Sequence, residues 1–224
     1  MGDISVDSAA VGKMQNNVDA RDSKVVVTGF GPFKHHTVNA SWEAVKLLPS
    51  LNVEDSLGVK FVIEEIPVSY EAVTERVPQL WKTHNPVLVV HVGVSSIAKE
   101  ITLETKAYKS GYWKPDVDGK VPESGCCSCG KDECISSTLD VDNICSEVNS
   151  CEGGSLACLS SDAGRYLCEF IYYTSLSFDK DRTIFIHVPE LYKPYTAMEL
   201  AEGISRIIKS MIGCVNRKKC LEAL

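Results

Sequence analysis

Four short, largely apolar runs, each followed by glycine or proline, most constrain how this chain folds. They cover residues 24–28, 61–66, 87–92 and 183–188 and are rich in valine and isoleucine. A strand exposed to water on one side alternates polar and apolar residues, whereas a continuous apolar strand is covered on both faces. The runs therefore predict strands of a buried, largely parallel sheet.

Amphipathic stretches lie between these runs. Apolar residues at helical spacing predict helices over 41–48 and 73–81. A third helix is predicted from the capping box of Thr196 and Glu199 to a stop at Gly213. Strands that alternate with helices indicate a single α/β domain with a largely parallel sheet.

The composition excludes several classes of function. The 224 residues carry a formal net charge of −7, which provides no basic surface for nucleic acid. Apolar runs fall well short of the roughly 20 residues that a membrane-spanning helix needs. The N-terminus shows no signal peptide, so the ten cysteines are expected to be reduced thiols. We expect a cytoplasmic protein with no nucleic-acid or membrane partner.

The pattern also sets the domain boundaries. Residues 1–22 are polar and aperiodic, which predicts a disordered tail before a domain over 23–214. Residues 215–224 are expected to form a C-terminal tail. The stretch 108–134 is rich in Gly, Pro, Ser and Cys and lacks periodicity, which predicts a long surface excursion.

Three residues stand where catalytic groups often lie. Cys168 falls in the first turns of an apolar helix that follows a small Gly-containing turn, and the helix dipole there favours thiolate. His187 ends an apolar strand, at the edge where open α/β sheets bind ligands. Glu104 ends a strand-like segment and could orient an imidazole. On spacing alone, however, a core cysteine, a structural histidine and a solvated carboxylate are the more frequent outcomes, and nothing local separates His187 from His91.

Several motifs, in order along the chain, carry a family resemblance. Residues 27–33 (VTGFGPF) and 39–45 (NASWEAV) are similar to the N-terminal signature of the pyroglutamyl peptidase I (pyrrolidone-carboxylate peptidase) family. Residues 160–168 (SSDAGRYLC) resemble its nucleophile motif, and 185–189 (FIHVP) its histidine motif. Residues 90–93 and 102–104 match the segment that holds its acid. The resemblance spans about residues 24–211 and is closest to the animal form, which also has a Cys-containing insertion.

The resemblance implies a fold, an activity and a site. The implied fold is a single-domain three-layer α/β/α sandwich around a mixed, largely parallel sheet. The implied activity is that of a cysteine omega peptidase, which hydrolyses an N-terminal pyroglutamyl residue from small peptides through a thioester. Cys168 is then the nucleophile, His187 the general base and acid, and Glu104 the residue that orients the imidazole; His91 stays structural. No cofactor or metal is expected, and the chain should be a monomer or a weak homo-oligomer.

The resemblance also implies a substrate pocket. Phe30 and Phe33 would sandwich the five-membered lactam ring, and Asn39 would brace their loop. A flat apolar ring with polar edges suits aromatic walls and a few directed hydrogen bonds. Val94, the stretch after Glu104, the insertion and Glu169 depart from the bacterial pattern, which leaves the details of the pocket and of oligomer contacts open.

The cysteines of the excursion suggest two alternatives. Cys126 and Cys129 have zinc-like spacing, but a structural zinc site normally needs a second spaced pair, and only Cys134 follows nearby. The fourth ligand would be Cys127, in a cramped loop, or the distant Cys145 or Cys151. We expect reduced, solvent-facing thiols instead. The competing hypotheses are a zinc-stabilised binding module that has lost catalysis, and a cysteine hydrolase acting on another small acyl or lactam substrate.

Overall fold

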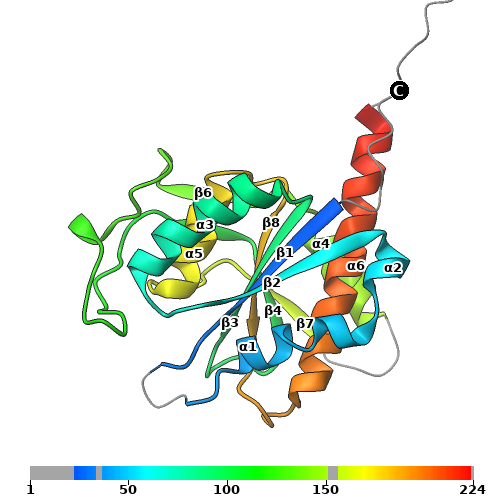
Figure 1. The fold of residues 1–224 in the computed structure, drawn as a ribbon, viewed down its shortest axis with the longest axis horizontal. Helices are drawn as coiled ribbons and strands as arrows, with labels where there is room; N and C mark the ends of the chain where they lie inside the picture. Colours follow the sequence, from blue (N-terminus) through cyan, green and yellow to red (C-terminus); the bar gives the residue numbers. More distant parts are fainter. Residues whose placement is uncertain (1–22, 34–36, 151–155, 223–224) are drawn as a thin grey trace, which may run out of the picture.

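The protein is built around one six-stranded sheet, with strand order β2-β1-β3-β8-β4-β7 (Figure 1). The structure, a computed structural model, describes residues 23–33, 37–150 and 156–222, with the backbone alone for 216–222. Four strands coincide with the predicted apolar runs: β1 (Ser23–Phe30), β2 (Val59–Ile66), β3 (Leu88–Val94) and β8 (Thr183–Val188). Two short strands, β4 (Ile101–Glu104) and β7 (Ala157–Ser160), complete the sheet.

The sheet is mixed, as expected, and mostly parallel. β1 pairs in parallel with β2 and β3, and β3 in parallel with β8. β4 runs antiparallel to β8 and parallel to β7. The one antiparallel pair therefore lies where the two short strands join the long ones, and the catalytic candidates His187 and Glu104 lie on its two strands.

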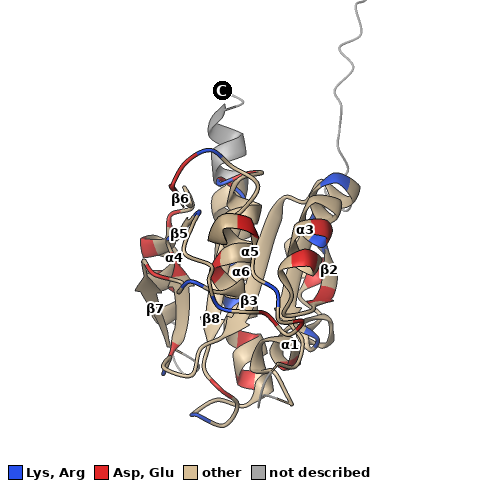
Figure 2. Cartoon of the chain, turned by 90° about the vertical axis from the view of Figure 1, so that its left-hand side faces the viewer, with Lys and Arg blue, Asp and Glu red and all other residues tan. Residues whose placement is uncertain are grey.

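Helices cover both faces of the sheet, which confirms the three-layer sandwich (Figures 1 and 2). Helices α1 (Ala40–Val45), α4 (Val141–Asn149) and α6 (Ala197–Glu222) pack on one buried cluster, and α3 (Tyr70–His84) and α5 (Leu167–Leu176) on the other. Along β1, Val25 and Val27 belong to the first cluster and Val26 to the second. Successive strand side chains point to opposite faces, so a strand covered on both sides must be apolar throughout.

Among the described residues there are also three short helical elements. They are the α-helical turn α2 (Glu54–Leu57) and the 3-10 turns Leu48–Leu51 and Glu123–Gly125. The predicted helix 41–48 is therefore divided into α1 and a separate 3-10 turn that contains Pro49. Proline lacks the N–H that a continuing α-helix would use, which accounts for the break.

Helix α6 is longer than predicted. Its capping box is formed, since the Thr196 N–H and hydroxyl both donate to a Glu199 carboxylate oxygen, at 2.7 and 2.8 Å. The helix does not stop at Gly213 but continues to Glu222, so most of the expected tail 215–224 is helical. A glycine inside a helix costs only about 1 kcal/mol, and Ile212 and Val215 on either side of it are buried against the core. The expected tail 1–22 lies outside the described residues.

The segment 109–133 is a long connection that packs onto α3 and α5. It joins β5 (Lys106–Tyr108) to β6 (Cys134–Ser136), and these two strands form a separate antiparallel ribbon. Tyr112 and Cys127 are buried in the cluster beneath the segment, and Asp116 accepts hydrogen bonds from the backbone N–H groups of Tyr70, Asp118 and Lys120. The expected surface excursion is therefore anchored to the domain, and the expectation that all of its thiols face solvent is wrong for Cys127.

Within the part of the chain that the structure describes, no helix is long and apolar enough to span a membrane.

Candidate active site

Cys168 lies in the first turn of α5, the second residue of that helix. The N-cap residue, Tyr166, is extended and offers no side-chain cap to the first backbone N–H groups. The preceding turn contains Gly164 at φ +80°, a left-handed conformation that other residues rarely adopt. Because the first N–H groups of a helix have no intrahelical acceptor, this end of α5 offers donors and a partial positive charge beside the thiol.

The space for the Cys168 sulfur comes from Gly93 on β3. A Cβ placed on Gly93 would lie 2.7 Å from Cys168 Sγ and 2.7 Å from Phe185 Cζ. Both distances are shorter than real Cβ contacts, so only glycine lets the thiol and the Phe185 ring approach the sheet there. Gly93 pairs with His187 on the neighbouring strand β8. The thiol that packs against Gly93 therefore lies beside the imidazole.

His187 and Glu104 form a buried ion pair beside this position. Nδ1 of His187 lies 2.8 Å from Oε1 of Glu104, and their side chains are 10% and 2% exposed. Because Nδ1 is used by the carboxylate, Nε2 is the imidazole atom left for Cys168 or substrate. The ring of Phe185 packs edge-on against the imidazole, with centroids 4.8 Å apart, and fixes its orientation.

Burial and two neighbouring side chains shift the pKa of the His187 imidazole. Burial lowers the pKa of His187, but the Cys168 thiolate and the Glu104 carboxylate raise it more, to about 10. The arrangement therefore favours the protonated form of the His187 imidazole, the form that can donate a proton.

His91, the second histidine on an apolar strand, has a different environment. It is fully buried, and its Nδ1 lies 2.7 Å from the Thr28 hydroxyl. Burial lowers the pKa of His91 to about 3, so the ring is neutral. It does not line the cleft that holds Cys168, which agrees with the structural role expected for it.

A cleft of about 800 Å³ opens in front of Cys168, His187 and Glu104. One wall is formed by residues 94–100, from the end of β3 onward. Another is formed by residues of β7 and of the turn between β7 and α5. The three predicted catalytic residues thus share one solvent-accessible site, although 83 positions separate Glu104 from His187.

The predicted pocket residues Phe30, Phe33 and Asn39 lie on the other side of Cys168. They line a second, small cavity that Cys168 also borders, together with Val68, Val94, Tyr166 and Leu167. Its volume is about 20 Å³. That is close to the volume required for one water molecule, so in this conformation a five-membered ring enters only if the side chains move apart.

Asn39 connects the start of α1 to the end of β1. Its amide Nδ2 donates to the Gly31 carbonyl at 2.9 Å, and its Oδ1 accepts from the backbone N–H and the hydroxyl of Ser41. Ser41 Oγ in turn accepts the Phe30 N–H at 3.0 Å. Asn39 is also the N-cap of α1, so one side chain connects the helix start to Phe30 and Gly31.

Two further groups at the site have no role in the sequence-based hypothesis. In the sequence, Gly93 ends an apolar run and belongs to the matched motif 90–93, but no role was predicted for it. Glu169, directly after the nucleophile, is fully buried; both of its oxygens lie 2.8 Å from Arg165 Nη1, and the Tyr108 N–H donates to it at 3.3 Å. Burial raises the pKa of Glu169 to about 7, while Arg165 opposes that shift.

Helix α5 also contacts the strand that carries the acid. Tyr172, one turn beyond Cys168, is fully buried, and its hydroxyl donates to the Glu104 carbonyl at 2.8 Å. Cys168 and Glu104 are therefore positioned by one helix and its contact with β4.

The described residues offer no support for the zinc alternative. Among them, no three His, Cys, Asp or Glu side chains gather as a metal site requires. Cys127 is buried, Cys126 and Cys129 are half-buried and Cys134 is exposed, so the cysteines of the segment differ widely in their surroundings.

Known proteins resemble the chain over nearly its whole described length. A family model described as pyroglutamyl peptidase matches residues 23–212. Pyroglutamyl-peptidase 1 of Mus musculus is 46% identical over 193 residues, which cover 86% of this chain and 91% of that protein. The Homo sapiens protein of the same name is 45% identical over 87% of this chain and 92% of its own. The crystal structure of Bacillus amyloliquefaciens pyroglutamyl peptidase I matches with a TM-score of 0.74 at 25% identity, over 85% of this chain and 97% of that one. The fold, the cleft and these similarities agree, and the chain belongs to the pyroglutamyl peptidase family.

Proposed function

We propose that this protein is a cysteine omega peptidase that removes the N-terminal pyroglutamyl residue from small peptides, with Cys168, His187 and Glu104 as its triad. The proposal rests on the 2.8 Å contact between His187 Nδ1 and Glu104 Oε1. This contact lies beside the space next to Gly93 that is filled by Cys168 Sγ. Family membership supplies the substrate class.

The first step forms a thioester. The Cys168 thiolate attacks the carbonyl carbon of the pyroglutamyl–Xaa bond, and the oxyanion is held by N–H groups of the first turn of α5. Nε2–H of His187 donates its proton to the amine of the leaving peptide, and the C–N bond breaks. Glu104 holds the imidazole through Nδ1 in the orientation and tautomer that this transfer needs.

The second step restores the enzyme. His187, now neutral, accepts a proton from a water molecule that attacks the thioester carbonyl. The C–S bond breaks, pyroglutamate leaves, and the Cys168 thiolate again faces an imidazolium. The resting state is therefore the charge pair favoured by the raised pKa of His187.

Substrate choice follows from the cavity on the other side of Cys168. Phe30 and Phe33 would enclose the lactam ring, and Asn39 would keep their loop in place. A prolyl group lacks the ring carbonyl and adds a charged amine, so it would leave buried polar groups unpaired. Such sites discriminate by about 10⁴-fold. We further propose a cytoplasmic location, no nucleic-acid partner, and a monomer or weak homo-oligomer.

The test is hydrolysis of a fluorogenic pyroglutamyl amide by the purified chain in the presence of reductant. We expect turnover by the wild type, loss of turnover by about 10⁶-fold in Cys168→Ala, and a similar loss in His187→Ala. The prolyl amide of the same fluorophore serves as the matched control substrate. Equal rates on both amides would refute the substrate class, and an active Cys168→Ala would refute the nucleophile.

A further inference from the structure

Cys168 lies between two hollows of very different size. It lines both the cleft of about 800 Å³ and the small cavity of about 20 Å³. His187 and Glu104 line the cleft and not the small cavity, whereas Phe30 and Phe33 line the small cavity and not the cleft. The thiol therefore separates a side that holds the imidazole from a side that holds the aromatic rings.

This division determines where each half of a substrate lies. In the proposed reaction the lactam ring enters between Phe30 and Phe33, and His187 donates a proton to the amine of the leaving peptide. A general acid must lie within hydrogen-bond reach of the atom that it protonates. Because His187 lines the cleft, the leaving amine and the peptide chain attached to it lie in the cleft.

One wall of the cleft ends in a tight turn with an isoleucine at its centre. The Ala98 N–H donates to the Ser95 carbonyl at 3.3 Å, which closes a turn around Ser96 and Ile97. The Ser95 N–H donates at 2.9 Å to the carbonyl of Val188, the residue after His187. The turn is therefore fixed to the strand that carries the general base.

Ile97 is 89% exposed, the most of any large apolar side chain among the described residues. The centre of a turn is usually occupied by a small or polar residue. A single exposed apolar side chain is common on protein surfaces, but this one lines the same cleft as Cys168 and His187, and the exposed Leu159 lines it too. An apolar side chain of a bound peptide would remove this surface from water, which is favourable.

The charged side chains of the cleft favour neither sign of charge in the leaving peptide. Besides the His187–Glu104 pair, the cleft is lined by two lysines, Lys99 and Lys114, and by two acids, Glu100 and Asp162. The charges balance, so apolar contact is the remaining basis for a preference.

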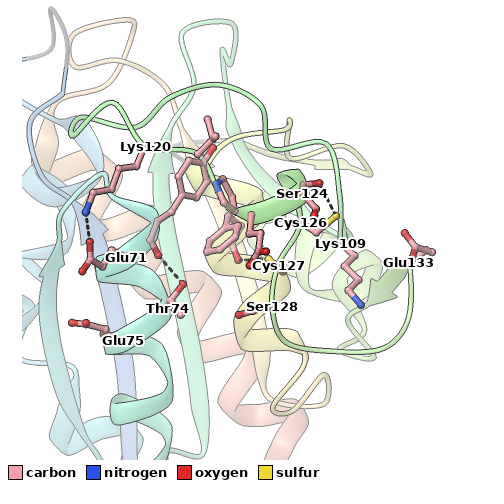
Figure 3. Close-up of a pocket in the computed structure, with 15 residues that line it drawn as sticks. Glu71, Thr74, Glu75, Lys109, Lys120, Ser124, Cys126, Cys127, Ser128 and Glu133 are labelled. Atoms are coloured by element: carbon pink, nitrogen blue, oxygen red, sulfur yellow. Dashed lines mark hydrogen bonds and ion pairs between the residues drawn. The ribbon is translucent and has the colours of Figure 1, made fainter.

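Figure 3 shows another large cavity, of about 650 Å³, between α3 and residues 120–128. Its walls include Glu71, Glu75 and Lys120 but neither Cys168 nor His187. A substrate held for proton transfer from His187 therefore does not place its leaving peptide there.

We propose that Ile97 is a specificity-determining residue, which contacts apolar side chains in the first two residues after the pyroglutamyl group. The proposal rests on the proposed peptidase function and adds a preference for peptides that are apolar at these two positions. The contact is made to a part of the substrate that does not react, so it should act mainly through KM.

The test compares two substrates that differ only in the leaving portion, pyroglutamyl-leucyl-leucine amide and pyroglutamyl-seryl-serine amide. For the wild type, we expect kcat/KM to be about tenfold higher for the leucine peptide. Ile97→Ser should lower kcat/KM for the leucine peptide by about tenfold, mainly through KM, and should change that of the serine peptide by less than about twofold. Ile97→Leu should keep the preference.

Met198→Ser is the matched control. Met198 is an exposed apolar residue of α6 that does not line the cleft, so its replacement should leave both rates unchanged.

A second measurement needs no turnover. The wild type is alkylated with iodoacetamide in the presence of leucyl-leucine amide, which has the chemistry of the leaving peptide, or of seryl-serine amide. Tryptic peptide 166–180, in which Cys168 is the only cysteine, reports the rate by mass spectrometry. Leucyl-leucine amide should slow alkylation of Cys168 in the wild type but not in Ile97→Ser, and seryl-serine amide should slow it in neither.

The outcomes separate this proposal from the proposed function. Equal kcat/KM for the two peptides, or a preference that survives in Ile97→Ser, would overturn the role of Ile97 and leave the peptidase function intact. A wild type that cleaves neither peptide would refute the peptidase function. In that case, equal protection of Cys168 by the two dipeptide amides would overturn the role of Ile97 as well.

Discussion

The carboxylate of Glu104 reaches the imidazole of His187 diagonally across the antiparallel pair of β4 and β8. In that register Thr102 is opposite His187, and Glu104 is opposite Phe185. Diagonal neighbours on one face are about 7–8 Å apart, a gap that long side chains can close, and here Oε1 comes within 2.8 Å of Nδ1. The contact therefore depends on the antiparallel orientation of β4.

Replacement of Glu104 by glutamine should slow catalysis and shift its pH dependence. The carboxylate is one of the groups that raise the pKa of His187 to about 10, so its loss should lower that pKa and move the alkaline limb of kcat/KM to lower pH. We expect kcat/KM to fall by about 10⁴-fold, less than for Cys168→Ala. A pH–rate profile measures both effects, and an unmoved alkaline limb would contradict the assignment.

The same raised pKa predicts how stability changes with pH. A histidine whose pKa rises from 6.5 to about 10 on folding contributes its stabilisation fully below pH 6.5 and loses it as pH rises through about 10. The wild type should therefore lose part of its stability between these values, and Glu104→Gln should lose less over the same range. Urea unfolding across that range measures the difference.

Residue patterns alone predicted the long strands but not the contact between Glu104 and His187. Largely apolar runs identify β1, β3 and β8, because a strand covered on both faces is mostly apolar. The same kind of run also identifies β2, although that strand lies at an edge of the sheet and is only partly buried. β4 has only four residues, and its orientation is decided by its partners β8 and β7. The family resemblance supplied the pairing of acid and base that the local pattern could not.

Gly93→Ala should strongly reduce activity, because it adds a methyl group where Cys168 and Phe185 leave no space. Its Cβ would lie 2.7 Å from both Cys168 Sγ and Phe185 Cζ, so the thiol and the ring must both move. A misplacement of about 1 Å can cost about 10²-fold in rate, and overpacking typically destabilises by about 1–3 kcal/mol. We expect kcat/KM for the pyroglutamyl amide to fall by at least about 10²-fold. Alkylation of Cys168 should also be slower.

The double variant Gly93→Ala/Phe185→Leu separates the two clashes. Leucine lacks the Cζ atom, so it relieves the contact with the ring but leaves the contact with the sulfur. Thermal stability should recover in part while kcat/KM stays low, with Phe185→Leu alone as the control. Full recovery of kcat/KM in the double variant would show that the sulfur does not depend on Gly93.

The segment between β5 and β6 was the least predictable part of the fold. It lacks a hydrophobic period because only isolated residues of it, such as Tyr112 and Cys127, enter the core. Helix α4 was overlooked although Val141, Ile144 and Val148 carry a helical spacing and Asp140 caps its start by accepting the Asn143 N–H. A glycine at 213 looks like a helix end in the sequence, whereas tertiary packing continues α6 past it.

The buried Glu169 should make Arg165 important for stability. Arg165→Met leaves the buried Glu169 carboxylate without its cation. Removing one partner of a fully buried pair lowers the free energy of unfolding by about 3–5 kcal/mol. Because the Arg165 side chain is 35% exposed, we expect a loss of about 2 kcal/mol. The pKa of Glu169 is raised to about 7, so burying its ionised form destabilises the folded state. As pH falls through 7, the carboxylate in the folded state takes up a proton. The effect of Arg165→Met should be larger at pH 8 than at pH 5.5 in urea unfolding.

Glu169→Gln is the matched variant for this prediction. The amide keeps the shape and still accepts the Tyr108 N–H, but it removes the buried charge. Arg165→Met in a Glu169→Gln background should therefore cost less than in the wild type and should not depend on pH over that range. An equal cost in both backgrounds would show that Arg165 acts through its other contacts, such as stacking on Tyr108.

Phe33→Ala should weaken substrate use without changing the reactivity of the thiol. Phe33 borders the small cavity next to Cys168, and an aromatic contact with a bound ring is worth about 0.5–1.5 kcal/mol beyond its buried area. We expect kcat/KM for the pyroglutamyl amide to fall by about tenfold or more, mainly through KM, while iodoacetamide alkylates Cys168 at the wild-type rate. Phe178→Ala is the matched control, since Phe178 is 42% exposed and stacks on Trp81 past the far end of α5. If both variants lower kcat/KM equally, the loss comes from general destabilisation and Phe33 does not hold the substrate ring.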